Sequence, residues 1–192
     1  MSQTLDNSSS NPGENVGASI RLAREKRGWS GAELAAASGV SRAMIDRIER
    51  GQSSPTAVLL GRLSAAFGIS LSAMLAGLPQ PDDGLTRAEA HRSWVDPTTG
   101  YVRRQVAASP AFAVDVTEVV LPAGQSVPYP AGAFTFIRQL VWVLEGTLTF
   151  TQAGEATELH AGDSFVLGAP VDRVYSNRTA HPCRYVVIVS PH

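Results

Sequence analysis

From about residue 20 to residue 76 the apolar positions recur every three or four residues, with short polar breaks between the runs. This spacing is the period of an amphipathic helix. Residues that cap or end helices stand at the breaks, among them Ser30, Ser41, Gly39 and Gly51. The pattern predicts an all-α domain of five short helices, at residues 20–27, 30–37, 41–50, 56–67 and 70–76.

The segment from Leu78 to Gly84, Leu-Pro-Gln-Pro-Asp-Asp-Gly, breaks the helical pattern and predicts a linker. Beyond it the period changes to two, in short runs rich in Val, Thr and aromatic residues that Gly or Pro separates. The predicted strands are residues 101–108, 111–121, 136–144, 147–151, 155–159, 164–167, 173–176 and 184–189. Short strands at regular spacing predict an all-β sandwich or barrel.

These patterns divide the 192 residues into a tail (1–13), a helical domain (14–78), a connecting segment (79–100) and a β domain (101–192). Hydrophobic residues make up 44% of the chain and charged residues 17%, which favours packed domains over disorder. No apolar run approaches the ~18 residues of a membrane helix, and residues 1–13 hold no apolar signal segment. We therefore expect a cytoplasmic protein that does not contact the membrane.

The net charge of −1 hides an uneven distribution along the chain. The helical domain holds eight basic and five acidic residues, a net charge of +3, whereas residues 85–192 hold eight basic and nine acidic residues. The nearly neutral total therefore does not exclude a nucleic-acid partner for the first half of the chain.

The stretch from Trp29 to Gly51 has the layout of a helix-turn-helix unit. Ala35 is small where two helices would cross, and Gly39 suits the tight turn between them. The spacing leaves one side of the third helix to solvent, namely Arg42, Ala43, Asp46, Arg47 and Arg50. A helix with Arg at its exposed N-terminal end is the type that enters the DNA major groove.

Six short motifs in this domain resemble the XRE family of phage-repressor-like domains over about residues 17–77. The motifs are Ile20-Arg-Leu-Ala-Arg24, Glu33-Leu-Ala35, Gly39-Val-Ser-Arg42, Ile48-Glu-Arg-Gly51, Ser54-Pro-Thr56 and Ile69-Ser-Leu71. The resemblance implies that Arg42, Ala43 and Arg47 face base edges and that Ser30, Ser41 and Gln52 hold phosphates. It also implies a pair between Arg24 and Glu49 inside the domain.

The chain departs from the family at one position. The family usually has Gln at the start of its second helix, and this chain has Gly31, so one side chain that anchors the DNA backbone is missing.

An alternative interpretation of the third helix also stands. Arg42, Asp46 and Arg50 are spaced four residues apart and could form surface ion pairs only.

In the β domain two turns, Leu144-Glu-Gly146 and Ala161-Gly-Asp163, together with Asn177, resemble the cupin superfamily of small jelly-roll barrels over about residues 101–190. The family's metal ligands would be two His within residues 132–135, a Glu at Gln139 and a His at Arg173. None of these positions holds the ligand, and a guanidinium cannot coordinate a metal. We therefore expect no metal, no other cofactor, no catalytic residues and no enzymatic activity.

The mouth of the predicted barrel offers a candidate site for a small anionic ligand such as a carboxylate. Its expected residues are Arg173, Gln139, Phe134, Tyr129, Tyr175 and Trp94. The alternative is a filled barrel in which Arg173 pairs with an acid such as Asp172 or Asp163. Trp142 and Phe136 are expected in the core, and Cys183 is expected to be an inert buried thiol.

A helix-turn-helix domain joined to a cupin barrel resembles bacterial one-component regulators. The resemblance implies a homodimer that binds double-stranded DNA at an inverted repeat, with recognition helices ~34 Å apart, and a small-molecule effector that changes their pose. Two alternatives remain from the sequence. One is a metal-dependent cupin enzyme with an accessory DNA-binding domain, and the other is a DNA-binding dimer that senses no ligand.

Overall fold

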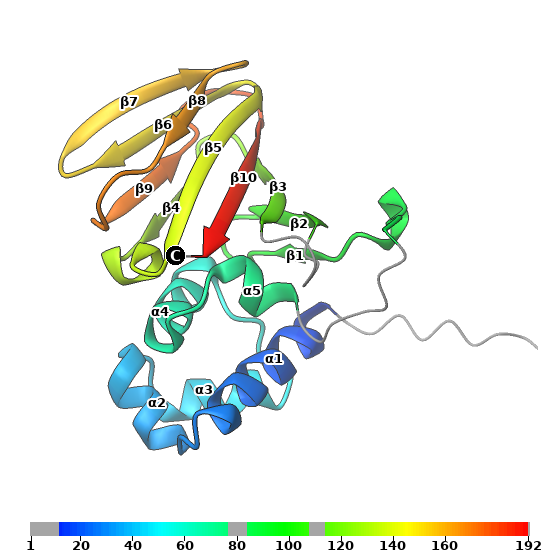
Figure 1. Cartoon of the computed structure of the whole chain (residues 1–192), viewed down its shortest axis with the longest axis vertical. Helices are drawn as coiled ribbons and strands as arrows, with labels where there is room; N and C mark the ends of the chain where they lie inside the picture. The colour runs from blue at the N-terminus through cyan, green and yellow to red at the C-terminus, as the bar shows by residue number, and fades with distance from the viewer. Residues whose placement is uncertain (1–11, 77–83, 108–113, 192) are drawn as a thin grey trace, which may run out of the picture.

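A computed structural model describes residues 12–76, 84–107 and 114–191, and Figure 1 shows their arrangement. Five α-helices at one end pack against two β-sheets at the other. The two-domain fold predicted from the sequence, helical first and β second, is confirmed. Among the described residues, no helix is long and apolar enough to cross a membrane.

The helices are α1 (Pro12–Lys26), α2 (Gly31–Ser38), α3 (Arg42–Glu49), α4 (Ala57–Phe67) and α5 (Leu71–Ala76). All five were predicted, although α1 begins eight residues earlier than the pattern from Ile20 indicated. Ser30 and Glu33 form the expected capping box at α2, with hydrogen bonds of 2.7 and 3.2 Å, and the Ser41 hydroxyl caps α3. These ends are set by local hydrogen bonds, which explains why sequence predicted them well.

The helical core places α1 across α3 at very short range. A Cβ added to Gly17 in α1 would lie 2.2 Å from the carbonyl oxygen of Ile48 in α3. Ile20, Ile45 and Ile48 are fully buried beside this crossing. The absence of a side chain at Gly17 therefore allows the two helices to approach.

The strands form a six-stranded antiparallel sheet in the order β1-β2-β3-β10-β5-β8 and a four-stranded antiparallel sheet in the order β4-β9-β6-β7. The strands are β1 (Ser93–Val95), β2 (Val102–Ala107), β3 (Asp115–Leu121), β4 (Ser126–Tyr129), β5 (Ile137–Glu145), β6 (Thr147–Gln152), β7 (Glu155–His160), β8 (Ser164–Val166), β9 (Arg173–Ser176) and β10 (Cys183–Pro191). Two short 3₁₀ helices accompany them, η1 (Ala88–Ala90) and η2 (Ala131–Phe134). Two facing antiparallel sheets are the architecture of a jelly roll.

Two strands, β1 and β4, were not predicted from the sequence. The first has three residues and the second four, one of them Pro128, so neither produces a clear alternation of apolar and polar positions. β1 lies in the predicted connecting segment and pairs with β2, with Trp94 opposite Arg103. This pairing brings Trp94 against the edge of the β domain.

Two aromatic residues expected in the core are exposed instead. Trp142 is 44% exposed and Phe136 is 54% exposed. Trp142 alternates along β5 with the buried Val141 and Val143, so it faces outward from the six-stranded sheet. The prediction was wrong because β5 is apolar on both faces, and a strand of that kind does not show which face meets the core.

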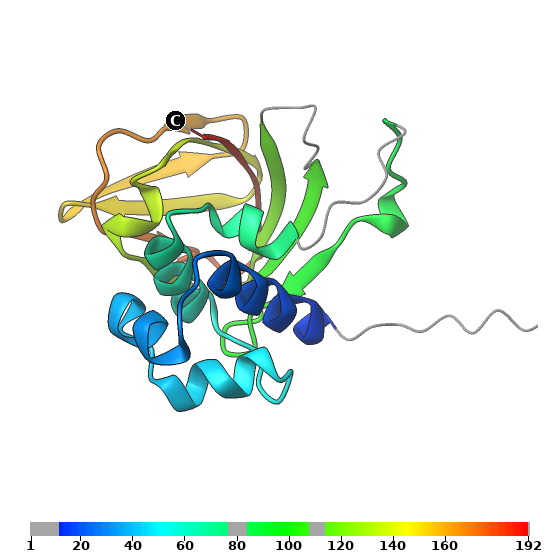
Figure 2. The same ribbon diagram turned by 60° about the horizontal axis from the view of Figure 1, so that its bottom comes forward.

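The two domains share one continuous apolar core. In both views α4 and α5 lie between the other helices and the sheets (Figures 1 and 2). A Cβ added to Gly61 in α4 would lie 2.9 Å from the ring of Tyr129 in β4, and one added to Gly132 in η2 would lie 3.0 Å from Ala65. At these two points α4 therefore packs in close contact with β4 and η2.

Candidate nucleic-acid interface and ligand cavities

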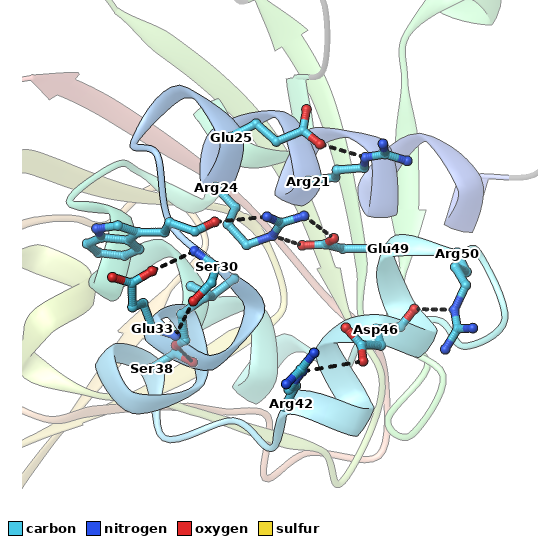
Figure 3. Close-up of polar contacts among 12 residues, drawn as sticks. Arg21, Arg24, Glu25, Ser30, Glu33, Ser38, Arg42, Asp46, Glu49 and Arg50 are labelled. Carbon is cyan, nitrogen blue, oxygen red and sulfur yellow. Dashed lines mark hydrogen bonds and ion pairs between the residues drawn. The ribbon is translucent and has the colours of Figure 1, made fainter.

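An ion pair inside the helical domain positions α3. Arg24 in α1 donates from Nε and Nη2 to the two carboxylate oxygens of Glu49, each over 2.7 Å, and from Nη1 to the carbonyl of Trp29 over 2.9 Å (Figure 3). Both side chains are largely buried. The expected pair is confirmed, and it fixes the orientation of α3 relative to α1 and the start of α2.

The outer face of α3 is exposed, as expected from the spacing. Arg42, Ala43 and Arg47 all lie on the surface. Arg42 reaches Asp46 only at 4.0 Å, and Arg50 donates to the backbone carbonyl of Asp46 over 3.0 Å (Figure 3). Of the surface ion pairs that the spacing of Arg42, Asp46 and Arg50 allowed, the structure therefore shows one, at a long distance. A contact this weak leaves the Arg42 guanidinium available to a partner.

The three residues expected to hold phosphates lie around the ends of α2 and α3. Ser30 and Ser41 are the exposed N-caps of the two helices, and Gln52 is exposed just after α3. The hydroxyls of Ser30 and Ser41 accept hydrogen bonds from backbone N–H groups of their own helices. A phosphate at this place would therefore meet the N-termini of α2 and α3 as well as side chains.

Gly31 adjoins the same surface. A Cβ placed on it would lie 3.6 Å from Oδ1 of Asp46 and 3.8 Å from Cγ of Arg42. These are ordinary contact distances, so a side chain at this position would begin beside Arg42 and Asp46 without a clash at its Cβ.

Inside the β domain, four of the six residues expected to bind a ligand come together around very little space. Tyr129, Phe134, Gln139 and Tyr175 line a cavity of about 30 Å³, the volume of about one water molecule. Gln139 donates from Nε2 to the Tyr175 hydroxyl over 2.9 Å, and the Tyr129 ring meets Tyr175 edge-on. Burial raises the pKa of the Tyr175 hydroxyl well above its usual value.

Arg173 lies at the edge of this cluster, with 1% of its surface exposed. Its guanidinium lies 4.4 Å from the centre of the Phe134 ring and donates to Gln152 and to the carbonyls of Gly168 and Ala169. Burial lowers the pKa of this guanidinium below its usual value. Within the described residues Arg173 forms no ion pair. The two acids considered as its partners, Asp172 and Asp163, instead accept hydrogen bonds from the backbone N–H groups of Ala131 and His160.

Trp94 does not join the other five residues. It lines a larger cavity, of about 220 Å³, between the helical domain and the sheet edge. No sequence pattern predicted this cavity, although Trp94 was among the residues expected to bind a ligand. Its lining comprises Val16, Ser72, Leu75, Ala90, His91, Arg92, Ser93, Trp94, Arg103, Gln105 and Thr117.

The positions that hold metal ligands in cupins serve packing here. Residues 131–134 form η2, which contacts α4, while Gln139 is bonded to Tyr175 and Arg173 covers Phe134. Across residues 12–76, 84–107 and 114–191, no three His, Cys, Asp or Glu side chains gather where they could hold a metal ion.

Comparison with known proteins agrees with the two-part architecture. Residues 20–74 match the helix-turn-helix family model HTH_3, and residues 137–189 match the cupin domain model Cupin_2. The HTH-type transcriptional regulator SutR of Escherichia coli K12 is 27% identical over 161 residues, covering 82% of this chain and 84% of that protein.

Two further comparisons extend this result. An uncharacterized HTH-type transcriptional regulator of Mycobacterium tuberculosis H37Rv is 29% identical over 150 residues, covering 67% of this chain and 56% of its own length. The crystal structure of an HTH_3 family transcriptional regulator from Vibrio cholerae superposes with a TM-score of 0.74 at 22% identity. That superposition covers 93% of this chain and 96% of the other, so the two share a fold.

Proposed function

We propose that this chain, which joins an HTH_3 helix-turn-helix domain to a Cupin_2 domain and is homologous to the regulator SutR, is a sequence-specific DNA-binding transcriptional regulator. The observation that carries the proposal is the exposed outer face of α3, on which Arg42 and Ala43 lie in the first turn and Arg47 in the last. An α-helix fits the major groove, and an Arg there can bond two acceptors of guanine at once.

The position of α3 in the molecule supports this role. The β domain packs on α4 and α5, and α3 lies at the end of the molecule away from the sheets (Figure 1). The Arg24–Glu49 pair holds α3 from behind, so its outer face is presented on a rigid support. A duplex can therefore approach α3 without meeting the β domain.

The working form is a homodimer that places two copies of α3 on an inverted repeat. A helical domain with a net charge of +3 gives weak, salt-sensitive binding alone, and linking two copies raises affinity through effective concentration. Recognition helices on adjacent half-sites of such a repeat lie ~34 Å apart.

The outer face of the six-stranded sheet supplies the surface that joins the two copies. Leu140 on β5 lies between Ile188 on β10 and Val166 on β8, and Trp142 follows in the next row. Trp142 is 44% exposed and Val166 is 69% exposed. An exposed apolar patch centred on an aromatic residue is the composition of a protein interface.

Charged residues border this patch along one side. Glu118 accepts from Arg104 and Arg184, and Arg184 also donates to Glu145 over 3.3 Å. An apolar centre with a polar rim is typical of interfaces between subunits. The occupant is a second copy of this chain because two-fold symmetry is what a palindromic operator requires.

A regulatory role is favoured over catalysis by the chemistry of the barrel. The side chains at the expected metal positions are an amide in Gln139 and a guanidinium in Arg173, and both donate hydrogen bonds within the β domain. A guanidinium is always protonated and offers no lone pair to a metal.

Selection of binding sites from random duplexes by the full-length protein tests the proposal. The wild-type protein is expected to enrich one inverted repeat. Arg42→Ala should relax base preference at one position of each half-site, by a factor of roughly 5 to 150, because a bidentate Arg–guanine contact contributes about 1–3 kcal/mol of discrimination. Arg178→Ala, which removes an exposed charge from the β domain, is the control. If the wild-type protein enriches no sequence, the proposal is wrong.

A further inference from the structure

The 220 Å³ cavity lies where the helical and β domains meet. Val16 of α1 and Ser72 and Leu75 of α5 form one wall, and residues 90–94, Arg103, Gln105 and Thr117 form the other. It is far larger than the space for one or two waters. The barrel interior, by contrast, is occupied by its own tyrosines. A small molecule in this cavity would therefore contact both domains at once.

The side chains around this cavity carry hydrogen-bond donors that are not used. Five buried side-chain nitrogens have no hydrogen-bond partner among the described residues, and four of them belong to residues that line this cavity. They are His91 Nδ1, Trp94 Nε1, Arg103 Nε and Gln105 Nε2. Unpaired buried donors are rare in folded proteins, and a cluster of them calls for an acceptor. Trp, Arg and the Gln amide nitrogen can only donate, so the missing partner is an acceptor.

The charge of the cavity indicates that this acceptor is an anion. Arg103 is 6% exposed, and its guanidinium donates to the Tyr101 hydroxyl over 2.8 Å and to the Ser72 hydroxyl over 3.0 Å. In the part of the chain that the structure describes, it has no carboxylate within ion-pair distance. Asp115, whose pKa the charge of Arg103 acts to lower, accepts a hydrogen bond from Ser70 and does not line the cavity. A buried cation without a counter-ion is unfavourable, and an anionic ligand would relieve it.

We propose that this junction cavity is the effector site of the protein and that it takes a small organic anion. The anionic oxygens are met by Arg103 and by the donors of Trp94 and Gln105, after small rotations of these side chains, while Val16 and Leu75 contact the apolar body. The shared chemistry of the ligand is a carboxylate or sulfonate on a small apolar group. This site is separate from the barrel mouth, where the sequence placed the ligand.

Regulation follows from the position of the site, and this step rests on the proposed function. A ligand that bridges α1 and α5 to β1–β3 stabilises one pose of the helical domain on the sheet. In a dimer that pose sets the separation of the two α3 helices. A coupling typical of allosteric proteins changes operator affinity by roughly 5- to 150-fold.

Calorimetric titration of the full-length protein with benzoate, benzenesulfonate and inorganic sulfate tests the site, with benzamide as the neutral comparison. At least one of the organic anions is expected to bind at millimolar concentration, and benzamide is not. Gln105→Glu keeps the size of the side chain but replaces a donor with a negative charge, so it should weaken anion binding by at least about tenfold. Gln125→Glu adds the same charge away from the cavity and should not.

Trp94→Phe removes the indole N–H and retains an aromatic ring, so it provides a second variant that preserves packing. Weaker anion binding in both variants, with circular dichroism unchanged, supports the site. If none of the anions binds, or if Gln105→Glu and Gln125→Glu bind equally well, the cavity is not the effector site. The proposed function fails separately, when the ligand-free protein enriches no DNA sequence.

Discussion

The carboxylate of Asp96, in the turn after β1, accepts a hydrogen bond from the backbone N–H of Ala57, the first residue of α4, over 2.5 Å. Its other oxygen accepts from the N–H groups of Thr98 and Thr99 over 2.7 and 3.0 Å. Asp96 is 2% exposed. A residue of the β domain thus caps a helix of the DNA-binding domain, where a negative charge also interacts favourably with the helix dipole.

Asp96→Asn is expected to destabilise the protein by about 1–3 kcal/mol, because the amide cannot accept at all the positions that the carboxylate does and leaves a buried donor unpaired. Urea unfolding followed by circular dichroism measures this loss. Thr56→Ala, which removes only the local cap to Leu59 N–H, is the matched control and should cost about 1 kcal/mol. A smaller loss for Asp96→Asn than for Thr56→Ala would contradict a capping role across the junction.

Two helical glycines are expected to respond differently to a side chain, because Gly17 lies at the close crossing of α1 and α3 and Gly31 of α2 does not. Gly17→Ala forces the helices apart, since the new Cβ would lie 2.2 Å from a backbone oxygen, and should lower the unfolding free energy by about 1–3 kcal/mol. Gly31→Ala meets nothing closer than 3.6 Å and should leave stability unchanged or slightly raised. Thermal unfolding of the two variants beside the wild type measures both effects, and equal losses would show that α1 and α3 can separate freely.

The Arg24–Glu49 pair predicts a large loss on removal of its negative partner. Glu49→Gln leaves a largely buried guanidinium without its carboxylate and should destabilise the protein by about 3 kcal/mol. Glu25→Gln breaks the exposed Arg21–Glu25 pair and should have no measurable effect on the unfolding midpoint. Chemical denaturation compares the two. A negligible loss in Glu49→Gln would mean that apolar packing alone holds α3.

Trp142→Glu tests the proposed dimer surface. Because Trp142 faces outward, the variant should fold normally and elute as a monomer in size-exclusion chromatography with light scattering. Its affinity for a two-half-site operator should fall by roughly 10²–10⁴, the gain that linkage of two binding modules provides. Thr157→Glu places the same charge on an exposed position of the four-stranded sheet and should remain dimeric. A Trp142→Glu variant that stays dimeric would move the interface elsewhere.

Cys183 provides a prediction that depends on pH. Its side chain is fully buried, and burial raises the pKa of the thiol to about 11. Because only the thiolate reacts, alkylation of the folded protein at pH 8 should be slow and should accelerate only as the pH approaches 11. In denaturant the thiol regains an ordinary pKa of about 8.5 and should react quickly at pH 8. Fast labelling of the folded protein would show that Cys183 is accessible.

The sequence alone predicted the features that depend on neighbouring residues in the chain. Hydrophobic periods of 3.6 and 2 separated the helical domain from the β domain, and the Ser30–Glu33 capping box marked a helix start, because each of these relationships spans only a few residues. The Arg24–Glu49 pair came from the family resemblance. The sequence also showed that Gln139 and Arg173 stand at positions where cupins have metal ligands.

Only the tertiary structure decided where the two domains meet and what lies between them. Five elements spread over about 100 residues each contribute to one cavity, with Val16, Ser72, Trp94, Arg103 and Thr117. Packing of α4 and α5 on the sheets brings these residues together. The orientation of Trp142 was decided in the same way, because a strand that is apolar on both sides does not encode which side faces the core. Short-range patterns determine elements and their ends, whereas the faces that become buried depend on contacts between segments far apart in the chain.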